Sequence, residues 1–448
     1  MKKRVLALFL AFCLAFTLLS TGATALNDGL NIEVASEAEL QAALNKTEKV
    51  SSIVVTGSFT VNSDCTIHFE GDKINYYYET EMRIPGNVTL TVGDGGSIGC
   101  AWYTFEGEWD DELTPGAKLI TCYGEGNTAI IIENGGAVSG DFTRNDGTLT
   151  VKAGGVLTLP GEMGEQSVIN VETGGTAHTT QGGRAVNNGE ISIETGASLA
   201  AFMGTTIVNR GTLNLSGDML IGGYVDDEGR ETTWFENNGT VNSDGGKVFA
   251  DYNVSAETRA LLESTFRVPV IYTGAPVYTE QELLDALNGE GAILSRANNL
   301  CIMNDITVTQ NTGTMEKNIF VPDGVTLTMA DGAYFDAPIF IEAGGKIDVL
   351  SGGTLSTTMG GSIENRGTVD IAQGGVFISR MGGTIINKNG GVINADGTLN
   401  ISDPEDWGMM GRFSDEGGDI TGSGRVNISN SELAVKAERV EPNTVLKG

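Results

Sequence analysis

Short segments in which apolar and polar residues alternate recur along most of the chain, and each is followed by one or two glycines. Leu149 and Val151 alternate with threonine in one such segment, and Ile191 and Ile193 alternate with serine in another. A period of two is that of a β-strand with one buried face, whereas an amphipathic helix has a period of about 3.6. The pattern therefore predicts many short strands and excludes helical repeats.

The glycines that end these segments recur about every 20 to 22 residues, for example at Gly154, Gly174 and Gly196. One unit of this length cannot bury its apolar face alone, so consecutive units must stack along an axis. Leucine-rich repeats have a similar period, but the sequence lacks their L-x-x-L-x-L frame. The spacing thus predicts an all-β chain that coils into a parallel β-helix, or β-solenoid.

An Asn-x-Gly tripeptide precedes many of the predicted strands. Asn and Gly tolerate positive φ, so we expect these tripeptides to turn the chain between coils. Stacked asparagine amides could also hydrogen-bond along the axis as a ladder. Both roles are structural rather than ligand-binding. The asparagines are Asn145, Asn187, Asn209, Asn237 and Asn365, with a variant at Asn389.

Strings such as residues 363–371, with Asn365 and Gly367 between alternating apolar residues, are shared with a known group of repeat proteins. On these strings the chain resembles the right-handed parallel β-helix of pectate-lyase-like and haemagglutinin-like exported bacterial proteins. The resemblance covers most of the chain after the N-terminal segment. It implies a right-handed coil, which the residues alone do not fix.

A longer duplication is superimposed on the short repeat. Residues 34–45 match residues 277–288, and residues 85–95 match residues 322–332. Ser36 with Glu39, and Thr279 with Glu282, have the spacing of a capping box at a helix start. We therefore expect two tandem β-solenoid domains, residues 26–268 and 269–448. Each would begin with a short α-helical cap, near residues 36–45 and 279–288, that covers the open edge of the coil.

The N-terminus has the pattern of an export signal. Lys2, Lys3 and Arg4 precede an uncharged apolar run, and small residues at positions 23–25 provide an A-x-A cleavage site. The run is shorter than the roughly 20 residues that span a bilayer as a helix. We predict a signal peptide over residues 1–25 and a secreted or extracellular, cell-surface-associated protein. We expect no membrane insertion of the mature chain.

Composition agrees with an ordered, acidic protein. Hydrophobic residues make up 40% of the chain despite 63 glycines, which excludes a disordered low-complexity sequence. The formal net charge is −31, and cleavage after position 25 would remove three basic residues and no acidic ones, which makes the mature chain more negative. Such a surface repels nucleic acid and anionic lipid.

Four cysteines follow the predicted signal, at Cys65, Cys100, Cys122 and Cys301. Their scatter excludes a zinc cluster of the C-x-x-C kind and a disulfide-dense scaffold. Cys100 and Cys122 are about one repeat apart, which would stack them within disulfide reach. Two buried thiols in one internal ladder are the alternative, and both remain open.

All four tryptophans fall in acid-rich stretches that interrupt the repeat. Insertions between coils commonly carry ligand contacts. A flat aromatic ring can accept the apolar face of a sugar, and carboxylates can accept its hydroxyl protons. The alternative is that the rings pin long loops to the coil. The candidate ligand-binding residues are Trp102, Trp109, Asp110, Asp111, Tyr224, Asp226, Asp227, Trp234 and Trp407.

Metal and enzyme chemistry have weaker signals. The acidic stretches could collect calcium, but no EF-hand loop or nonapeptide calcium array is present, so no cofactor is expected. The resemblance to pectate lyases implies an alternative function, a polysaccharide lyase or glycoside hydrolase acting on acidic polysaccharide. Paired acids with Arg230 near one pair fit this idea, but adjacent strand residues face opposite sides, so we assign no catalytic residue. His68 and His178 are far apart in the sequence and have no acid or cysteine at metal-ligand spacing, so we expect them at the surface or in turns.

These patterns together favour a structural, adhesin-like β-helix protein rather than an enzyme. Its expected partners are polysaccharide, cell wall or a host-surface glycan, and not nucleic acid.

Overall fold

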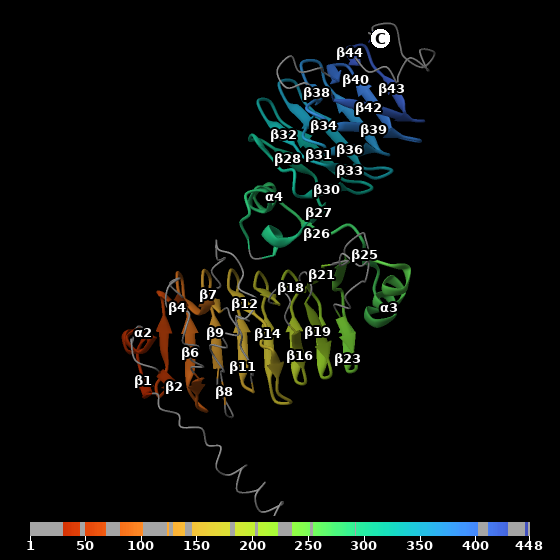
Figure 1. Cartoon of the computed structure of the whole chain (residues 1–448). Helices are drawn as coiled ribbons and strands as arrows, with labels where there is room; N and C mark the ends of the chain where they lie inside the picture. Colours follow the sequence, from red (N-terminus) through yellow and green to blue (C-terminus); the bar gives the residue numbers. More distant parts are fainter. Residues whose placement is uncertain are drawn as a thin grey trace, which may run out of the picture. The chain divides into compact units, whose positions relative to one another are not determined.

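The chain forms a right-handed parallel β-solenoid of about 13 turns among the described residues, with few helices, as predicted (Figure 1). This computed structural model describes residues 30–44, 50–68, 81–101, 123–124, 129–138, 146–179, 184–201, 205–222, 235–250, 254–291, 293–401, 411–428 and 444–446. The chain divides into two compact units, residues 1–150 with 160–168, and residues 151–159 with 169–448. The expected domain boundary between residues 268 and 269 stays a prediction.

In the first unit each coil contributes strands to three parallel sheets in a fixed order. The first sheet contains β1 (Leu30–Val34), β2 (Val50–Val55), β5 (Glu81–Ile84) and β8 (Tyr123–Gly124). The second contains β3 (Phe59–Val61), β6 (Thr89–Val92), β9 (Ala129–Ile132) and β11 (Thr148–Val151). Of the strands of the third sheet, this unit holds β4 (Asp64–His68), β7 (Ser97–Ala101) and β10 (Ala137–Val138). The short β13 (Glu162–Met163) follows later in the chain and is not a strand of these three sheets.

The second unit begins with a set of strands that we call the earlier run. Its first sheet contains β16 (Arg184–Asn187), β19 (Thr206–Asn209) and β22 (Phe235–Asn237). Its second sheet contains β14 (Val168–Val171), β17 (Glu190–Ile193), β20 (Thr212–Leu215) and β23 (Thr240–Ser243). Its third sheet contains β12 (Val156–Thr158), β15 (Thr176–His178), β18 (Ser198–Ala201), β21 (Asp218–Ile221), β24 (Lys247–Ala250) and β25 (Val270–Ile271).

The remaining strands of the second unit, the later run, form three further sheets. The first contains β26 (Ala275–Val277), β27 (Asn299–Ile302), β30 (Asn318–Val321), β33 (Ile339–Ile341), β36 (Ser362–Asn365), β39 (Thr384–Lys388) and β42 (Arg412–Glu416). The second contains β28 (Ile306–Val308), β31 (Thr326–Met329), β34 (Lys346–Val349), β37 (Thr368–Ile371), β40 (Val392–Ala395) and β43 (Asp419–Thr421). The third contains β29 (Thr312–Gly313), β32 (Tyr334–Asp336), β35 (Thr354–Thr357), β38 (Val376–Ser379), β41 (Thr398–Ile401), β44 (Arg425–Ile428) and β45 (Thr444–Leu446).

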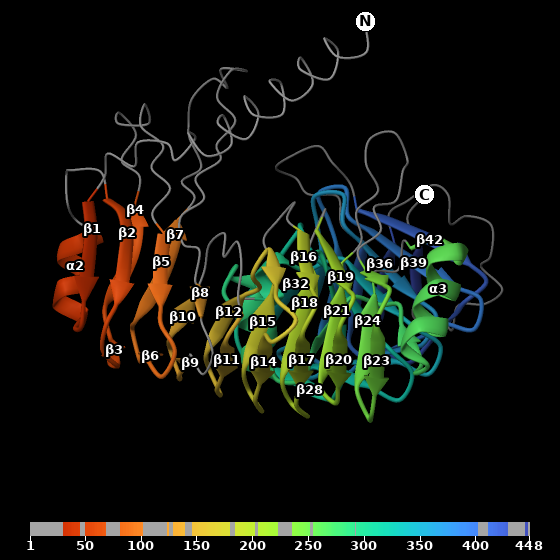
Figure 2. The same ribbon diagram turned by 90° about the horizontal axis from the view of Figure 1, so that it is seen from below.

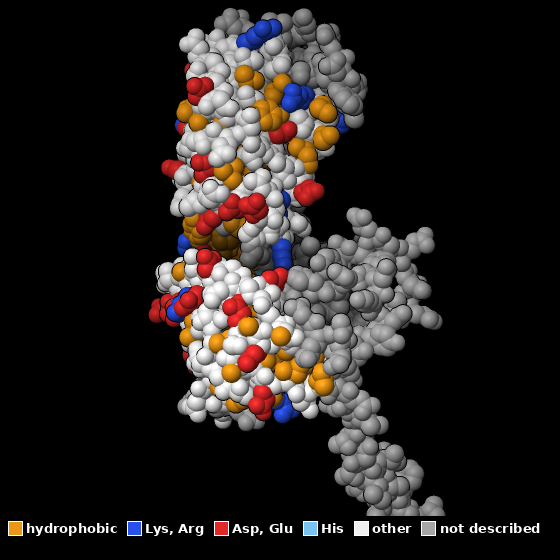
Figure 3. Space-filling view, turned by 90° about the vertical axis from the view of Figure 1, so that its left-hand side faces the viewer, with side chains coloured by type: hydrophobic (Ala, Val, Ile, Leu, Met, Phe, Trp, Pro, Cys, Tyr) orange, Lys and Arg blue, Asp and Glu red, His pale blue; other side chains and the backbone are white. Residues whose placement is uncertain are grey.

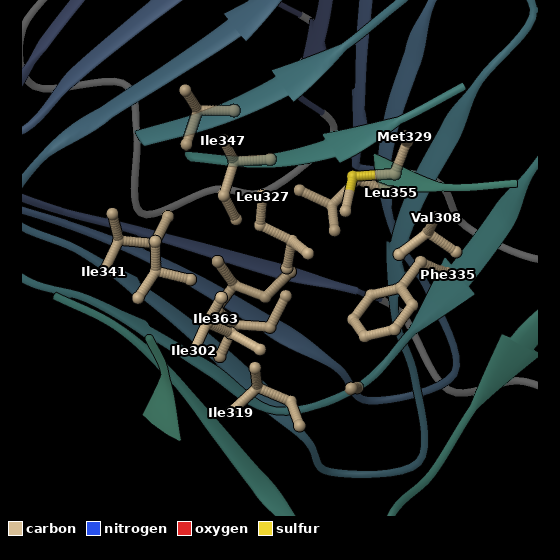
Figure 4. Close-up of a cluster of buried hydrophobic side chains, with 14 of the residues drawn as sticks. Ile302, Val308, Ile319, Leu327, Met329, Phe335, Ile341, Ile347, Leu355 and Ile363 are labelled. Carbon is tan, nitrogen blue, oxygen red and sulfur yellow. The ribbon is translucent and has the colours of Figure 1, made fainter. Parts of the chain in front are cut away.

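Because apolar and polar residues alternate, every second side chain of a strand points into the coil. Side chains at the same inward position of successive coils form a column. Ile319, Ile339, Ile363 and Ile385 are register partners in consecutive coils and are fully buried. Figure 4 shows how such side chains from all three sheets of the later run converge on the interior. Burial of each side chain of this size stabilises the fold by about 1.5–3 kcal/mol. The stack therefore supplies a core that no single coil could form.

The predicted asparagine ladder is confirmed. The tripeptides also lie at bends between strands, as predicted, and the amides of Gly189 and Gly367 donate to Asn187 Oδ1 and Asn365 Oδ1. Only the positive φ expected for these turns is absent from the described tripeptides. The Asn187 amide donates to Asn209 Oδ1, and the Asn209 amide donates to Asn237 Oδ1, each at 2.8 Å. Asn365 donates in the same way to Asn387 at 2.9 Å, which takes the place expected for Asn389. These asparagines end strands, and Asn87 is the only described asparagine with positive φ. Asn145 lies outside the described residues.

The glycines of several Asn-x-Gly tripeptides are required for a different physical reason from the one expected. Gly211 and Gly367 do not have positive φ. A Cβ atom at Gly211 would lie 2.0 Å from the carbonyl oxygen of Gly189, and one at Gly367 would lie 2.2 Å from that of Gly345. Glycine is needed here because the preceding coil approaches the backbone closely.

Helices are present at both positions where a capping box predicts one. They are α2 (Glu37–Leu44) and α4 (Glu280–Leu287). Thr279 and Glu282 form the complete capping box of α4, and the Glu39 amide of α2 donates to Ser36 Oγ. Leu40 and Ala43 of α2 are buried. Two helices were not predicted, α3 (Ala256–Phe266) and the 3-10 turn η1 (Leu294–Arg296).

Helix α3 packs at the end of the earlier run. Figure 2 shows it beside β23. The ring of Phe266 lies 4.8 Å from that of Phe235 in β22, measured between centroids, and Leu262 is also buried. The helix therefore shields apolar side chains of the last coil of this run.

Within the second unit, the outward face of the third sheet of the earlier run is covered rather than exposed. Ala200, Leu220 and Phe249 belong to the same buried cluster as Val277 of β26 and Leu283 of α4. The two runs thus share one apolar core along this face.

Polar contacts accompany this apolar packing. The Tyr278 hydroxyl donates to Asp218 Oδ2 at 2.7 Å, and the Lys247 ammonium lies 5.5 Å from the Tyr278 ring centroid. Burial raises the pKa of Tyr278, and the bond to Asp218 adds to this effect. Burial also raises the pKa of the Asp218 carboxyl. His178 is only 5% exposed on the same sheet, so the expectation of a surface or turn position was wrong.

Candidate functional site

The candidate ligand-binding residues predicted from the sequence all lie outside the described residues. The strands on either side of them are described. Residues 102–122 join β7 to β8 and contain Trp102, Trp109, Asp110 and Asp111. Residues 223–234 join β21 to β22 and contain Tyr224, Asp226, Asp227 and Trp234. Residues 402–410 join β41 to β42 and contain Trp407.

All three insertions occupy the same position in the order of the coil. β7, β21 and β41 each belong to a third sheet, and β8, β22 and β42 each belong to a first sheet. Each insertion therefore starts after the third strand of one coil and ends at the first strand of the next. We call this position the third-to-first corner. Residues 69–80, which contain Tyr76, Tyr77 and Tyr78, connect β4 to β5 at the equivalent corner.

The stack continues in register across these insertions. Asn209 pairs with Asn237 across residues 223–234, and Thr384 pairs with Arg412 across residues 402–410. Arg83 likewise pairs with Tyr123 across residues 102–122. Long acidic and aromatic segments are therefore accommodated without interrupting the core.

The register bears on the expected stacking of Cys100 and Cys122. Cys100 lies in β7, where Ser97 pairs with Ala137 of the next coil, so the next strand of this sheet lies further along the chain than one repeat of 20 to 22 residues. Cys122 lies outside the described residues, so the pairing stays a prediction.

Cys65 and Cys301 are free and buried. Burial raises the pKa of both thiols to about 11. A protonated, buried thiol is a poor nucleophile and metal ligand, so neither fits a reactive role.

The described residues contain one polar cluster that sequence reasoning missed, on the outward side of β32, β35 and β38. The Tyr334 hydroxyl donates to Ser356 Oγ at 3.0 Å, and the Thr358 hydroxyl donates to Asp336 Oδ2 at 2.8 Å. The Arg380 Nη2 donates to the Tyr334 hydroxyl at 2.8 Å. Asp336 Oδ1 and Arg380 Nε are buried without a hydrogen-bond partner. The cluster joins three successive coils by polar contacts.

Methionines border this cluster at a tight turn. Met359 and Met381 follow Thr358 and Arg380 and have left-handed φ values of 50° and 51°. Met315 Sδ lies 4.0 Å from the Thr358 hydroxyl. The repeated Met-Gly-Gly tripeptides at 359–361 and 381–383 are the sequence signal that could have identified this turn.

The described residues contain no group of three or more His, Cys, Asp or Glu side chains arranged to hold a metal ion. No helix in these same stretches is long and apolar enough to cross a bilayer. Figure 3 shows acidic side chains scattered over the visible face with fewer basic ones among them.

Comparisons with known proteins give little further information. No family model and no curated protein matches the chain. Among solved structures, a crystal structure of a TibA fragment, residues 55–350, hyper-glycosylated by TibC, is 13% identical. The match covers 88% of this chain and 99% of that chain, with a TM-score of 0.20. Because this score is low, the similarity supports no conclusion about function, and the expected pectate-lyase-like relationship is not confirmed.

Proposed function

We propose that this chain is an exported, adhesin-like surface protein without catalytic activity that binds carbohydrate through the insertions at its third-to-first corners. The observation that carries the proposal is the shared corner of all candidate ligand-binding residues. A rigid scaffold that displays variable loops from one position is a common arrangement for recognition, because loop ordering then costs less binding free energy.

The chemistry of the insertions fits a glycan partner. Each insertion combines at least one tryptophan with neighbouring carboxylates, as in Trp109 with Asp110 and Asp111. The ring offers an apolar platform and the carboxylates accept hydroxyl protons. The partner class is polysaccharide, cell wall or a host-surface glycan, and calcium remains a further proposal for the acidic stretches.

The proposal includes two tandem β-solenoid domains, each with a helical cap. Sheet membership changes between β25 and β26, which supports a boundary near residues 268–269. Helix α2 packs against β1 to β4, and α4 packs against β28 and β29. Each helix therefore packs against strands near the start of one proposed domain. Removal of residues 1–25 on export completes the proposal.

Glycan binding by the chain without residues 1–25 tests this function. We expect Trp109→Ala, Trp234→Ala or Trp407→Ala to weaken binding about tenfold, which corresponds to about 1.4 kcal/mol. Phe340→Leu, an aromatic change on a strand outside the insertions, should leave binding unchanged. Circular dichroism should show the same β-sheet content in all variants.

Two results would count against the proposal. Unchanged binding in all three tryptophan variants would remove the insertions from recognition. Release of unsaturated uronides from acidic polysaccharide, detected by ultraviolet absorbance, would show that the protein is an enzyme.

A further inference from the structure

The Met-Gly-Gly turns place two methionines in an unfavourable backbone conformation. Met359 and Met381 have left-handed φ values, and each is followed by a glycine with positive φ, Gly360 at 84° and Gly382 at 81°. A side chain at such a position costs free energy that glycine avoids. In the neighbouring turns the residues at the position of the methionines, Ser351 and Gln373, do not have positive φ, and only the glycines that follow them do. The methionine side chains therefore replace a residue that the backbone alone would favour.

The two methionines are neighbours in successive coils. The Met359 amide donates to the Met381 carbonyl oxygen at 3.0 Å, so the turns are held in register. Their backbones are then separated by about 4.8 Å, the spacing of adjacent strands. Two metal–sulfur bonds of about 2.3 Å each, the length of a zinc–thiolate bond, would span a similar distance.

A third thioether lies at the same edge. Met315 Sδ is 4.0 Å from the hydroxyl of Thr358, the residue that precedes Met359. Met359 is 68% exposed and Met315 is 36% exposed, although methionine is an apolar side chain. Methionine has three rotatable side-chain bonds, so its sulfur can adjust to a shared ligand.

We propose that Met315, Met359 and Met381 form a binding site for a soft monovalent metal ion, of the class of Cu(I) and Ag(I). Thioether sulfur is an uncharged, soft donor that favours Cu(I) over the hard ions Ca²⁺ and Mg²⁺. The neighbouring carboxylate of Asp336 already accepts from Thr358, and the Arg380 guanidinium bonds to Tyr334. The polar cluster thus holds the turns in place beside the exposed Met315 and Met359 side chains, and the site is independent of the proposed carbohydrate binding.

Silver titration of the full chain with ¹³C-methyl-labelled methionine tests this site by NMR. We expect Ag(I) to shift the methyl signals of Met315, Met359 and Met381 at lower concentration than any other methionine signal. Ca²⁺ added at the same concentration should leave these three signals in place. Single leucine variants assign each signal.

Matched variants make the test quantitative. Met359→Leu with Met381→Leu should weaken Ag(I) binding at least tenfold, and Met303→Leu, in a partly buried position against the core, should not. Melting temperatures should show that all variants fold. Unmoved methyl signals in the unmodified chain, or equal Ag(I) affinity in the double variant, would overturn the proposal.

Discussion

Among single residues, His178 best illustrates how packing between the two strand runs changes side-chain chemistry. Its ring lies on the outward side of β15 but is buried, and Nδ1 lies 3.0 Å from the Thr179 carbonyl oxygen. Because that oxygen only accepts, Nδ1 carries the proton of the neutral ring. Burial lowers the pKa of His178 below its usual 6.5, and the Arg296 guanidinium lowers it further.

This burial predicts a dependence of stability on pH. As pH falls below about 6.5, the unfolded chain binds a proton at His178 before the folded chain does. The free energy of unfolding should therefore fall between pH 7 and pH 5, by at most about 1.4 kcal/mol per pH unit from this residue. Urea unfolding at several pH values measures the effect. His178→Gln should flatten the dependence, whereas His68→Gln should keep it, and equal slopes in both variants would contradict the assignment.

Residue-level expectations from the sequence were correct about identity and partly wrong about cause. The recurrence of Asn187 and Asn209 predicted an amide ladder, because identical residues in stacked coils must meet. It did not show that these asparagines stay in extended backbone. The need for Gly367 depends on how closely Gly345 approaches, and that distance is set by coil stacking rather than by local sequence.

For whole elements, the asparagine ladder links each coil to the next at the end of its first strand. The Asn209 amide donates to Asn237 Oδ1 at 2.8 Å and to the Thr240 carbonyl oxygen at 3.0 Å, while its own Oδ1 accepts from Asn187. Its side chain is buried, so these bonds satisfy polar atoms that water cannot reach.

Replacement of this amide by a carboxylate should be costly. Asn209→Asp keeps the shape but removes both donated bonds, and we expect a loss of about 2–4 kcal/mol of unfolding free energy at pH 7. Chemical denaturation measures it. Asn427→Asp is the control, because Asn427 Oδ1 accepts from Arg425 Nε at 3.1 Å and a carboxylate can do the same. Similar losses in both variants would show that the ladder is not the cause.

Helix prediction succeeded where the capping signal was complete. Thr279 with Glu282, and Ser36 with Glu39, each marked a helix start. Helix α3 was missed because its N-cap, Ser255, is followed at the third position by Thr258, so the glutamate of a capping box is absent. The cluster of Tyr334, Asp336 and Arg380 was missed for another reason. Its members come from three coils and meet only once the register is known.

In the molecule as a whole, the packing of the two runs within the second unit has a signal in the sequence, which the strand prediction did not use. Strands that alternate strictly bury one face, but residues 219–221 and 248–250 are apolar without interruption. Uninterrupted apolar strands are typical of sheets covered on both faces. Leu220 and Phe249 are the outward residues of these strands, and both are buried against the later run. The glycine spacing alone predicts coils but not this second layer.

Parallel stacking in register is the central claim, and cross-linking of designed cysteine pairs measures it directly. Asn214 and Asn242 are register partners on the outward side of β20 and β23, and their side chains are bonded at 2.8 Å. Adjacent strands at about 4.8 Å lie within the roughly 4.4–6.8 Å Cα separation that a disulfide accepts, whereas a partner two residues away lies at roughly 7–8 Å. Under mild oxidation, Asn214→Cys with Asn242→Cys should cross-link readily, and Asn214→Cys with Thr240→Cys should not. Equal cross-linking of the two pairs, or the reverse preference, would contradict parallel stacking in this register.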